Sequence, residues 1–109
     1  MGYRTLGVDL SPAYVRKAQE IAAREGVRDR ATYRVGDMRE LASIVLPDER
    51  PFDVALNLWT SLGYYGEETD AAILRGYHDL VRPGGLFVLF IVNRDQVVRR
   101  FDPQGWEEF

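Results

Sequence analysis

Asp9, at the carboxyl end of a predicted strand, is the first residue whose position suggests chemistry. The apolar segment 5–10 predicts a short buried strand. Ser11 and Pro12 then predict a helix start, because serine can cap the first turn and proline has no N–H to leave unpaired there. In open α/β sheets, ligands bind beside such strand ends. A carboxylate here can accept hydrogen bonds from both hydroxyls of a ribose, or it can simply cap the helix.

A second acid and a mixed polar and aromatic segment follow two later strands. Asp37 comes directly after the predicted strand 31–35, where its alternative role is again a helix cap. Asn57 lies near the end of the apolar segment 52–59 and begins the sequence NLWTSLGYY. Loops at strand ends often carry binding residues. The plainer alternatives are a hydrogen bond from Asn57 to backbone and structural packing of the aromatic residues.

The elements that must position these residues alternate along the chain. Strands are predicted over 5–10, 31–35, 52–59 and 86–92, and helices over 12–25, 37–45 and 67–81. The segment 47–51 reads as a loop because it is polar and contains two prolines. Alternating strands and helices are typical of a parallel sheet with right-handed crossovers. The sequence therefore predicts an α/β fold with flanking helices.

The predicted strands and helices lead to two predictions about which side chains are buried. The seven apolar residues 86–92 predict a central strand buried on both faces. In the helix 12–25 one stripe at helical spacing is expected to face the sheet. Its members are Tyr14, Ala18, Ile21, Ala22 and Glu25.

Composition narrows the class of protein. The 109 residues are 46% hydrophobic and 28% charged, which is typical of one globular domain over 1–109. The absence of cysteine excludes disulfides and thiolate metal sites. One histidine alone cannot build a histidine metal site, and the net charge of −3 argues against a nucleic-acid partner. Without a membrane-spanning run or a basic and apolar leader, a cytoplasmic protein is expected.

Four landmarks now stand in order: GVDLSP, YRVGDM, FDVALNLWTSLGYY and LVRPGGLFVLFI. Together they resemble the class I S-adenosylmethionine-dependent methyltransferases, particularly those that act on small molecules. The resemblance covers residues 2 to 106. It implies a Rossmann-like sheet in a three-layer α/β/α arrangement, S-adenosylmethionine as cofactor and a small-molecule substrate.

The resemblance implies a role for each residue of the first two landmarks. Asp9 matches the acid that binds the ribose hydroxyls, and Leu10 matches the apolar residue that packs on the adenine. Asp37 matches the acceptor for the adenine amino group. Met38 matches the neighbour whose backbone N–H meets the ring and whose side chain lies along it. These roles suit the chemistry, because carboxylates accept from amines and apolar side chains cover the faces of a purine.

The third landmark corresponds to the region of the reacting groups. Asn57 and Leu58 match the strand end beside the methionine part of the cofactor. Trp59, Tyr64 and Tyr65 are then expected near the substrate or the cofactor sulfur. No catalytic residue is assigned, because methyl transfer from a sulfonium needs in-line positioning and exclusion of water rather than a metal or an acid–base pair.

The family's glycine-rich loop would precede GVDLSP, and its last strands would follow Trp106. The sequence therefore resembles the central part of the domain, with about four strands, and we expect weak or no cofactor binding and no measurable turnover from it alone. The family's first strand lies between the two strands 5–10 and 52–59. We expect the sheet either to close with these two strands adjacent or to form a homodimer by strand exchange.

Two other functions stay open at this point. An NAD-binding Rossmann fragment is possible, because Asp9 would suit the ribose of that cofactor equally well. A non-catalytic oligomerising remnant is the other, because the missing glycine-rich loop removes part of the site. Binding of S-adenosylhomocysteine, of NADH, or of neither by a tight dimer would separate the three.

Overall fold

The computed structural model describes residues 2–58, 62–63, 65–91 and 99. The strands are β1 (Thr5–Asp9), β2 (Ala31–Val35), β3 (Phe52–Asn57) and β4 (Val81–Leu89). The α-helices are α1 (Pro12–Arg24), α2 (Leu41–Ile44) and α3 (Glu67–Leu80), and short 3₁₀ turns are η1 (Met38–Glu40) and η2 (Pro47–Glu49). The helix predicted over 37–45 is therefore a 3₁₀ turn followed by one α-helical turn, and the predicted loop 47–51 contains a 3₁₀ turn.

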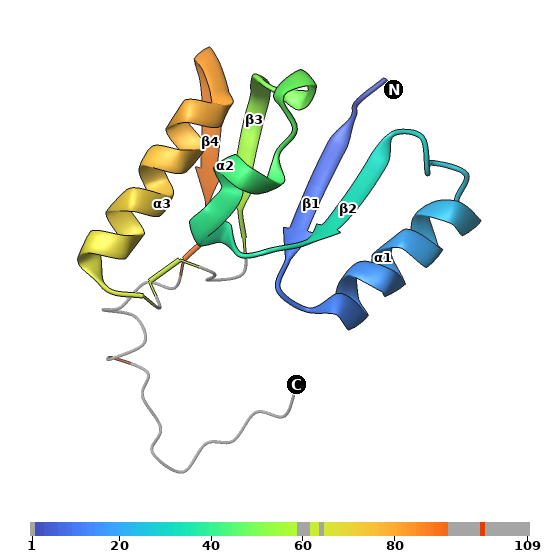
Figure 1. The fold of residues 1–109 in the computed structure, drawn as a ribbon, viewed down its shortest axis with the longest axis horizontal. Coiled ribbons are helices and arrows are strands. Elements are labelled where there is room, and N and C mark those ends of the chain that lie inside the picture. Colours follow the sequence, from blue (N-terminus) through green and yellow to red (C-terminus); the bar gives the residue numbers. More distant parts are fainter. Residues whose placement is uncertain (1, 59–61, 64, 92–98, 100–109) are drawn as a thin grey trace.

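The strands form two parallel pairs, β1 with β2 and β3 with β4. In the first pair, Asp9 lies opposite Val35, so both strands end at the same edge. Across Figure 1 the order of the strands is β4, β3, β1 and β2. Parallel strands that alternate with helices confirm the predicted Rossmann-like α/β fold.

The expected closure of one sheet is wrong for the described residues. β1 and β3 are neighbours in Figure 1, yet the described strands form two separate sheets with no ladder between these two strands. The two pairs meet through side chains instead of backbone hydrogen bonds. One edge of β1 and one edge of β3 are consequently unpaired within the described residues. The alternative of pairing with a second copy stays a prediction.

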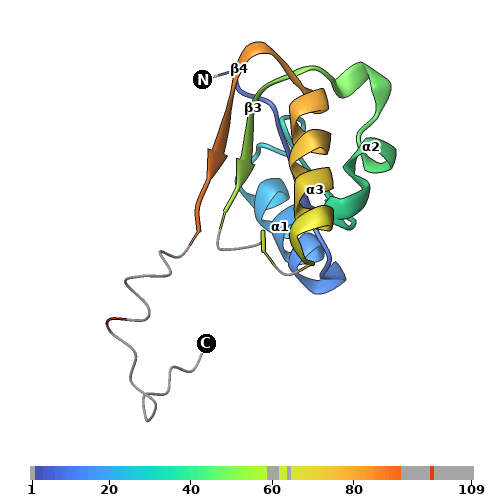
Figure 2. The ribbon, with the colours of Figure 1, turned by 90° about the vertical axis from the view of Figure 1, so that its left-hand side faces the viewer.

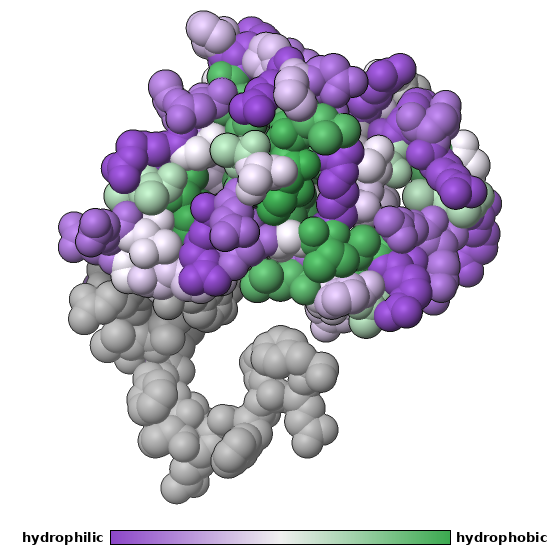
Figure 3. All heavy atoms as spheres, viewed as in Figure 1, coloured by the Kyte–Doolittle hydropathy of each residue, from purple (hydrophilic) through white to green (hydrophobic). Residues whose placement is uncertain are grey.

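A small apolar core joins the two strand pairs. Its buried centre consists of Leu41 and Val45, at either end of α2, and Leu80 at the end of α3. Partly buried side chains from both pairs and both helical regions pack against this centre: Leu6, Val8, Met38, Phe52 and Tyr77. In Figure 3 apolar residues gather near the middle of the view, where the two pairs meet. The helices that follow β2 and β3 therefore hold the two pairs together.

The buried stripe of α1 agrees with the predicted one only in part. Ala22 is buried, as predicted, but the other buried residue is Val15, whereas Tyr14 is 72% exposed and Ile21 is also exposed. Val15 and Tyr14 are adjacent and lie seven residues before Ala22 and Ile21, so helical periodicity alone could not separate the two faces. α1 packs against β1 and β2, and its buried Val15 and Ala22 have smaller side chains than the exposed Tyr14 and Ile21.

The prediction that the strand over 86–92 is buried on both faces is wrong for residues 86–91, the part of it that the structure describes. Leu86 is 63% exposed, and the apolar residues that follow it, as far as Ile91, are also exposed. Figure 2 shows α3 along one side of β3 and β4, with no described element along the other side. β4 also begins at Val81, earlier than the predicted residue 86, because Gly84 and Gly85 lie at an irregularity within the strand. A strand with one covered face exposes its other face, whatever its sequence.

Candidate functional site

Asp9 takes part in a cap and still has a free oxygen. Its Oδ1 accepts a hydrogen bond of 2.8 Å from the backbone N–H of Ser11. The Ser11 hydroxyl in turn accepts from the N–H of Tyr14 and caps α1. Among the described residues nothing donates to the second carboxylate oxygen of Asp9, which is exposed. The two sequence readings are therefore compatible, because one oxygen holds the orientation and the other is available to a ligand.

Asp37 is more heavily engaged. Its Oδ1 accepts from the backbone N–H of Arg39 at 2.9 Å and caps the turn η1. The Arg39 side chain donates to both carboxylate oxygens, with Nε at 3.1 and 2.9 Å and Nη2 at 2.5 Å. These side-chain and backbone hydrogen bonds lower the pKa of Asp37 below its ordinary value, so the group is an ionised acceptor at neutral pH. A ligand amine must share or displace the Arg39 side chain.

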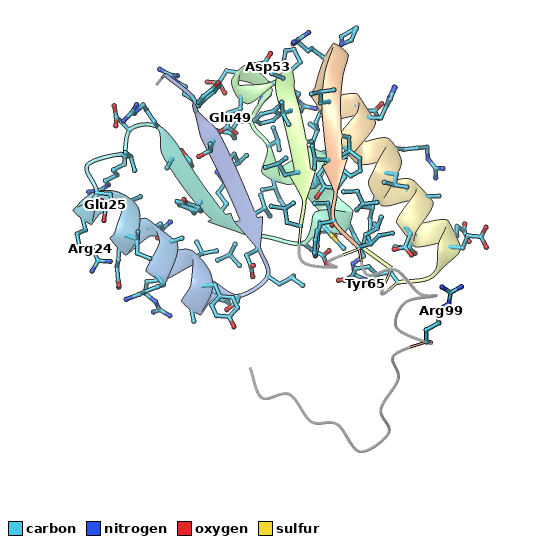
Figure 4. All side chains as sticks on the ribbon, turned by 180° about the vertical axis from the view of Figure 1, so that it is seen from behind. Arg24, Glu25, Glu49, Asp53, Tyr65 and Arg99 are labelled. Atoms are coloured by element: carbon cyan, nitrogen blue, oxygen red, sulfur yellow. The ribbon has the colours of Figure 1, made fainter. Side chains whose placement is uncertain are left out.

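Arg39 also reaches the segment that follows β3. The guanidinium carbon lies 4.3 Å from the centroid of the Tyr65 ring, which is a cation–π distance. Figure 4 shows Tyr65 at the end of the molecule where the strands finish, whereas Asp53 lies at the opposite end. Tyr65 thus contacts the arginine that pairs with Asp37, and its expected place near the substrate or the cofactor sulfur stays a prediction. Trp59 and Tyr64 lie outside the described residues.

Met38 is the first residue of η1, where a backbone N–H has no acceptor within the turn. Its side chain packs against the shared core, and its Sδ lies 3.6 Å from the Nδ2 of Asn57. The backbone N–H of Met38 is therefore available to donate to a ligand, while its side chain is held by the apolar core and by Asn57.

Asn57 is the buried polar residue of the site. It is 3% exposed, and its Nδ2 also donates to the hydroxyl of Tyr77 at 3.2 Å. Its Oδ1 is buried and has no hydrogen-bond partner among the described residues. The Tyr77 ring packs against Phe87, with centroids 4.9 Å apart, and burial raises the pKa of Tyr77. The plain expectation of a bond from Asn57 to backbone is thus replaced by bonds to two side chains.

Leu10 and Leu58 follow β1 and β3 directly, and both are exposed apolar residues at strand ends. The exposure of Leu10 suits the apolar surface that the resemblance assigned to it. The role of Leu58 beside the methionine part of the cofactor stays a prediction.

The structure brings most of the expected residues to one edge. The backbone N–H of Gly36 donates to the carbonyl of Asp9 at 2.9 Å, so the turn carrying Asp37 is joined directly to the end of β1. Contacts of Arg39 and Asn57 then connect this turn to Tyr65 and to the end of β3. Beside Met38 and Arg39, between η1, α2 and α3, lies a surface hollow of about 500 Å³. Another hollow, of about 300 Å³, lies at the amino ends of β1 and β2, away from the carboxylates.

Sequence reasoning missed Arg39 and Tyr77. Arg39 had a local signal, because a cation two residues after a strand-end acid can bond to it. Tyr77 had none, since it is 20 residues from Asn57 and looked like any apolar member of a helix face.

Two negative findings concern the described part of the chain. It contains no group of three or more His, Asp or Glu side chains arranged to hold a metal ion. None of its helices is both long and apolar enough to cross a membrane.

Comparison with known proteins gives two matches. Residues 1–85 match the model of a family described as "Methyltransferase domain". An erythromycin 3''-O-methyltransferase from Saccharopolyspora erythraea is 34% identical over 86 residues, which cover 79% of this chain. The matched part is 26% of that relative, so the chain spans about a quarter of its length. No solved structure matches the chain.

Proposed function

The chain belongs to the methyltransferase-domain family, and from this premise we propose that it carries the adenosine-binding part of a small-molecule methyltransferase. S-adenosylmethionine is the methyl donor of this family. The observation that carries the proposal is the pair of acids at one sheet edge. Asp9 ends β1, Asp37 follows β2, and a backbone hydrogen bond from Gly36 to Asp9 joins the two strand ends.

The residues present fit the adenosine part of this cofactor. Asp9 has an oxygen free to accept from ribose hydroxyls. Met38 offers a backbone N–H and Asp37 offers an ionised carboxylate, which together suit the donor and acceptor edge of an adenine. Leu10 supplies exposed apolar surface for a purine face. When bound, the cofactor supplies an electrophilic methyl group on its sulfonium.

For the substrate side, we propose that Tyr65, Trp59 and Tyr64 surround the methyl acceptor, with Asn57 and Leu58 beside the methionine part of the cofactor. The position of Tyr65 next to Arg39 supports this arrangement. These groups would act by orienting the acceptor and excluding water. The name of the relative states transfer to an oxygen of erythromycin, which supports a small-molecule hydroxyl as acceptor. We keep a cytoplasmic location and a single domain over 1–109 as predictions.

Titration of the purified chain with S-adenosylhomocysteine, observed through the ligand's NMR signals, tests the function and remains sensitive to weak binding. We expect saturable binding that Asp9→Asn and Asp37→Asn each weaken about tenfold or more, because each removes a charged hydrogen-bond acceptor. Asp53→Asn is the matched control, since Asp53 pairs with Arg82 at the start of β3, away from the site. Binding of NADH in preference would favour the NAD alternative.

For the partner, we propose a homodimer in which the unpaired edges of β1 and β3 accept a strand from a second copy. The separation of the described strands into two sheets supports this proposal. Light scattering over a range of protein concentrations tests it, and a monomer at every concentration would rule it out. A dimer that binds neither S-adenosylhomocysteine nor NADH would favour the non-catalytic alternative.

A further inference from the structure

Three polar or polarisable side chains from three elements meet beneath the candidate site. Asn57 at the end of β3 donates from Nδ2 to the hydroxyl oxygen of Tyr77 on α3, at 3.2 Å. The same Nδ2 lies 3.6 Å from Sδ of Met38 in η1. We call this group of Met38, Asn57 and Tyr77 the amide relay. It connects α3 to the residue expected along the adenine.

The orientation of the Asn57 amide follows from the chemistry of its neighbours. In the structure the NH₂ group of Asn57 faces Met38, which suits a thioether sulfur because that atom accepts a hydrogen bond and cannot donate one. The second N–H of that group is then directed to Tyr77, whose hydroxyl oxygen accepts it. Oδ1 consequently faces away from both partners, where it is buried without a donor.

The unpaired Oδ1 of Asn57 lowers the stability of the folded chain, whereas an apolar residue at position 57 would not. A buried carbonyl oxygen without a donor costs about 1–3 kcal/mol, and an apolar side chain of similar shape avoids that cost. Asn57 is 3% exposed, so water does not offset the cost. An unsatisfied buried group in a native structure calls for a reason other than stability. The contact with Met38 supplies one, because this long side chain otherwise has three torsions free to vary.

We propose that Tyr77 is a positioning residue of the cofactor site, which acts through the Asn57 amide to fix the Met38 side chain against which the purine lies. The proposal rests on the proposed function for the identity of the ligand. It goes beyond that function because it concerns contacts among Met38, Asn57 and Tyr77 that are present without a ligand. Tyr77 touches neither cofactor nor substrate in this role, and its hydroxyl acts only on the amide.

Methyl-¹³C labelling of methionine gives a direct probe, because the chain has only two methionines, at positions 1 and 38. Loss of a signal in Met38→Leu assigns the Met38 methyl group. In the free chain, we expect Tyr77→Phe to shift the Met38 methyl carbon signal, which reports the terminal torsion of the side chain. Tyr14→Phe is the matched control, since Tyr14 is 72% exposed on α1, and it should leave the signal unchanged. An unchanged Met38 signal in Tyr77→Phe would overturn the proposal.

Ligand binding adds a measurement that a purely structural role would not move. We expect Tyr77→Phe to weaken S-adenosylhomocysteine binding about fivefold, as for loss of one neutral hydrogen bond. In a Met38→Leu background the same change should have almost no effect, because residues that act as a unit are not additive. Equal weakening of S-adenosylhomocysteine binding in both backgrounds would overturn the proposal that Tyr77 acts through Met38.

The two failures are distinguishable. If the unaltered chain does not bind S-adenosylhomocysteine, the proposed function fails, while the free-chain spectra still decide the relay. If the Tyr77→Phe variant does not fold, the unaltered chain still tests the amide relay, through a nuclear Overhauser effect between the Asn57 side-chain amide protons and the Met38 methyl group. Presence of this effect supports the relay, and its absence contradicts it.

Discussion

The carboxyl ends of the two strand pairs present opposite kinds of polar group. At the end of β1 and β2, two exposed or half-exposed carboxylates are held by hydrogen bonds to residues two positions away. At the end of β3, one neutral amide is buried and held by side chains 19 and 20 residues away. The first end can form from local sequence alone, whereas the second exists only after α3 and η1 have packed. The residues of the proposed adenosine site are thus held by local hydrogen bonds, whereas the residues that support them meet only through tertiary packing.

This contrast predicts that substitutions in the shared core disturb the carboxyl ends of both strand pairs, whereas substitutions at the surface disturb only one of these ends. The largest effect is expected from Leu80→Ala, because Leu80 belongs to the core shared by both pairs. Deletion of a buried leucine side chain costs about 2–5 kcal/mol, a large part of the stability of a small domain. Urea unfolding measures the loss. Leu74→Ala on the exposed side of the same helix is the control and should cost far less.

The buried amide offers the next test. Asn57→Leu removes an unsatisfied oxygen and fills the site with apolar atoms, so we expect the free energy of unfolding to stay equal or rise by up to about 2 kcal/mol. The affinity for S-adenosylhomocysteine should nevertheless fall by about tenfold, because removal of a functional polar group can stabilise a protein while weakening its activity. Thermal unfolding and ligand titration on one sample measure both. A variant that loses stability and retains affinity would contradict the functional reading of Asn57.

The ion pair between Arg34 and Glu49 lies next to the carboxyl end of β2. Removing it tests whether this strand end needs support from residues outside the turn η1. Arg34 on β2 donates to both oxygens of Glu49, at 2.6 and 2.8 Å, and both side chains are half-buried. Figure 4 shows Glu49 toward the end of the molecule away from Tyr65. The hydrogen bond from Arg34 is the largest cause of the lowered pKa of Glu49, whose ordinary value is 4.5.

Because the folded-state pKa of Glu49 is the lower one, its contribution to stability is fully present above about 4.5 and disappears as the pH falls through the lowered pKa. We expect Glu49→Gln to cost about 1 kcal/mol at neutral pH and to reduce the acid-induced loss of stability below pH 4.5. Urea unfolding as a function of pH measures the difference. Parallel curves for the two proteins would exclude a role for this pair.

The smallest effect is expected at the pair formed by the exposed Arg39 and the half-buried Asp37. Arg39→Gln frees the carboxylate oxygens from the guanidinium, while the backbone N–H of residue 39 can still cap the turn. We expect the affinity for adenosine to rise about twofold, as for loss of a competing surface ion pair. Arg24→Gln on α1 is the control. Weaker binding by Arg39→Gln would mean that Arg39 contacts the ligand instead of competing with it.

The sequence alone determined the local parts of this protein. Asp9, Ser11 and Pro12 predicted a strand end and a capped helix start, and the structure forms both with bonds between near neighbours. Asp37 likewise lies in the turn after β2, and the four landmarks predicted the family to which the chain belongs. These features could be read because neighbours in sequence are sufficient to form them.

Only the tertiary structure decided which residues meet at a distance. Val15 rather than Tyr14 faces the sheet, and the apolar β4 is exposed, because burial depends on which element covers a face and not on the side chain alone. The contact of Tyr77 with Asn57 arises because α3 packs its Tyr77 face beside the end of β3. A helical period places such residues on a face, but packing selects the strand end that the face meets.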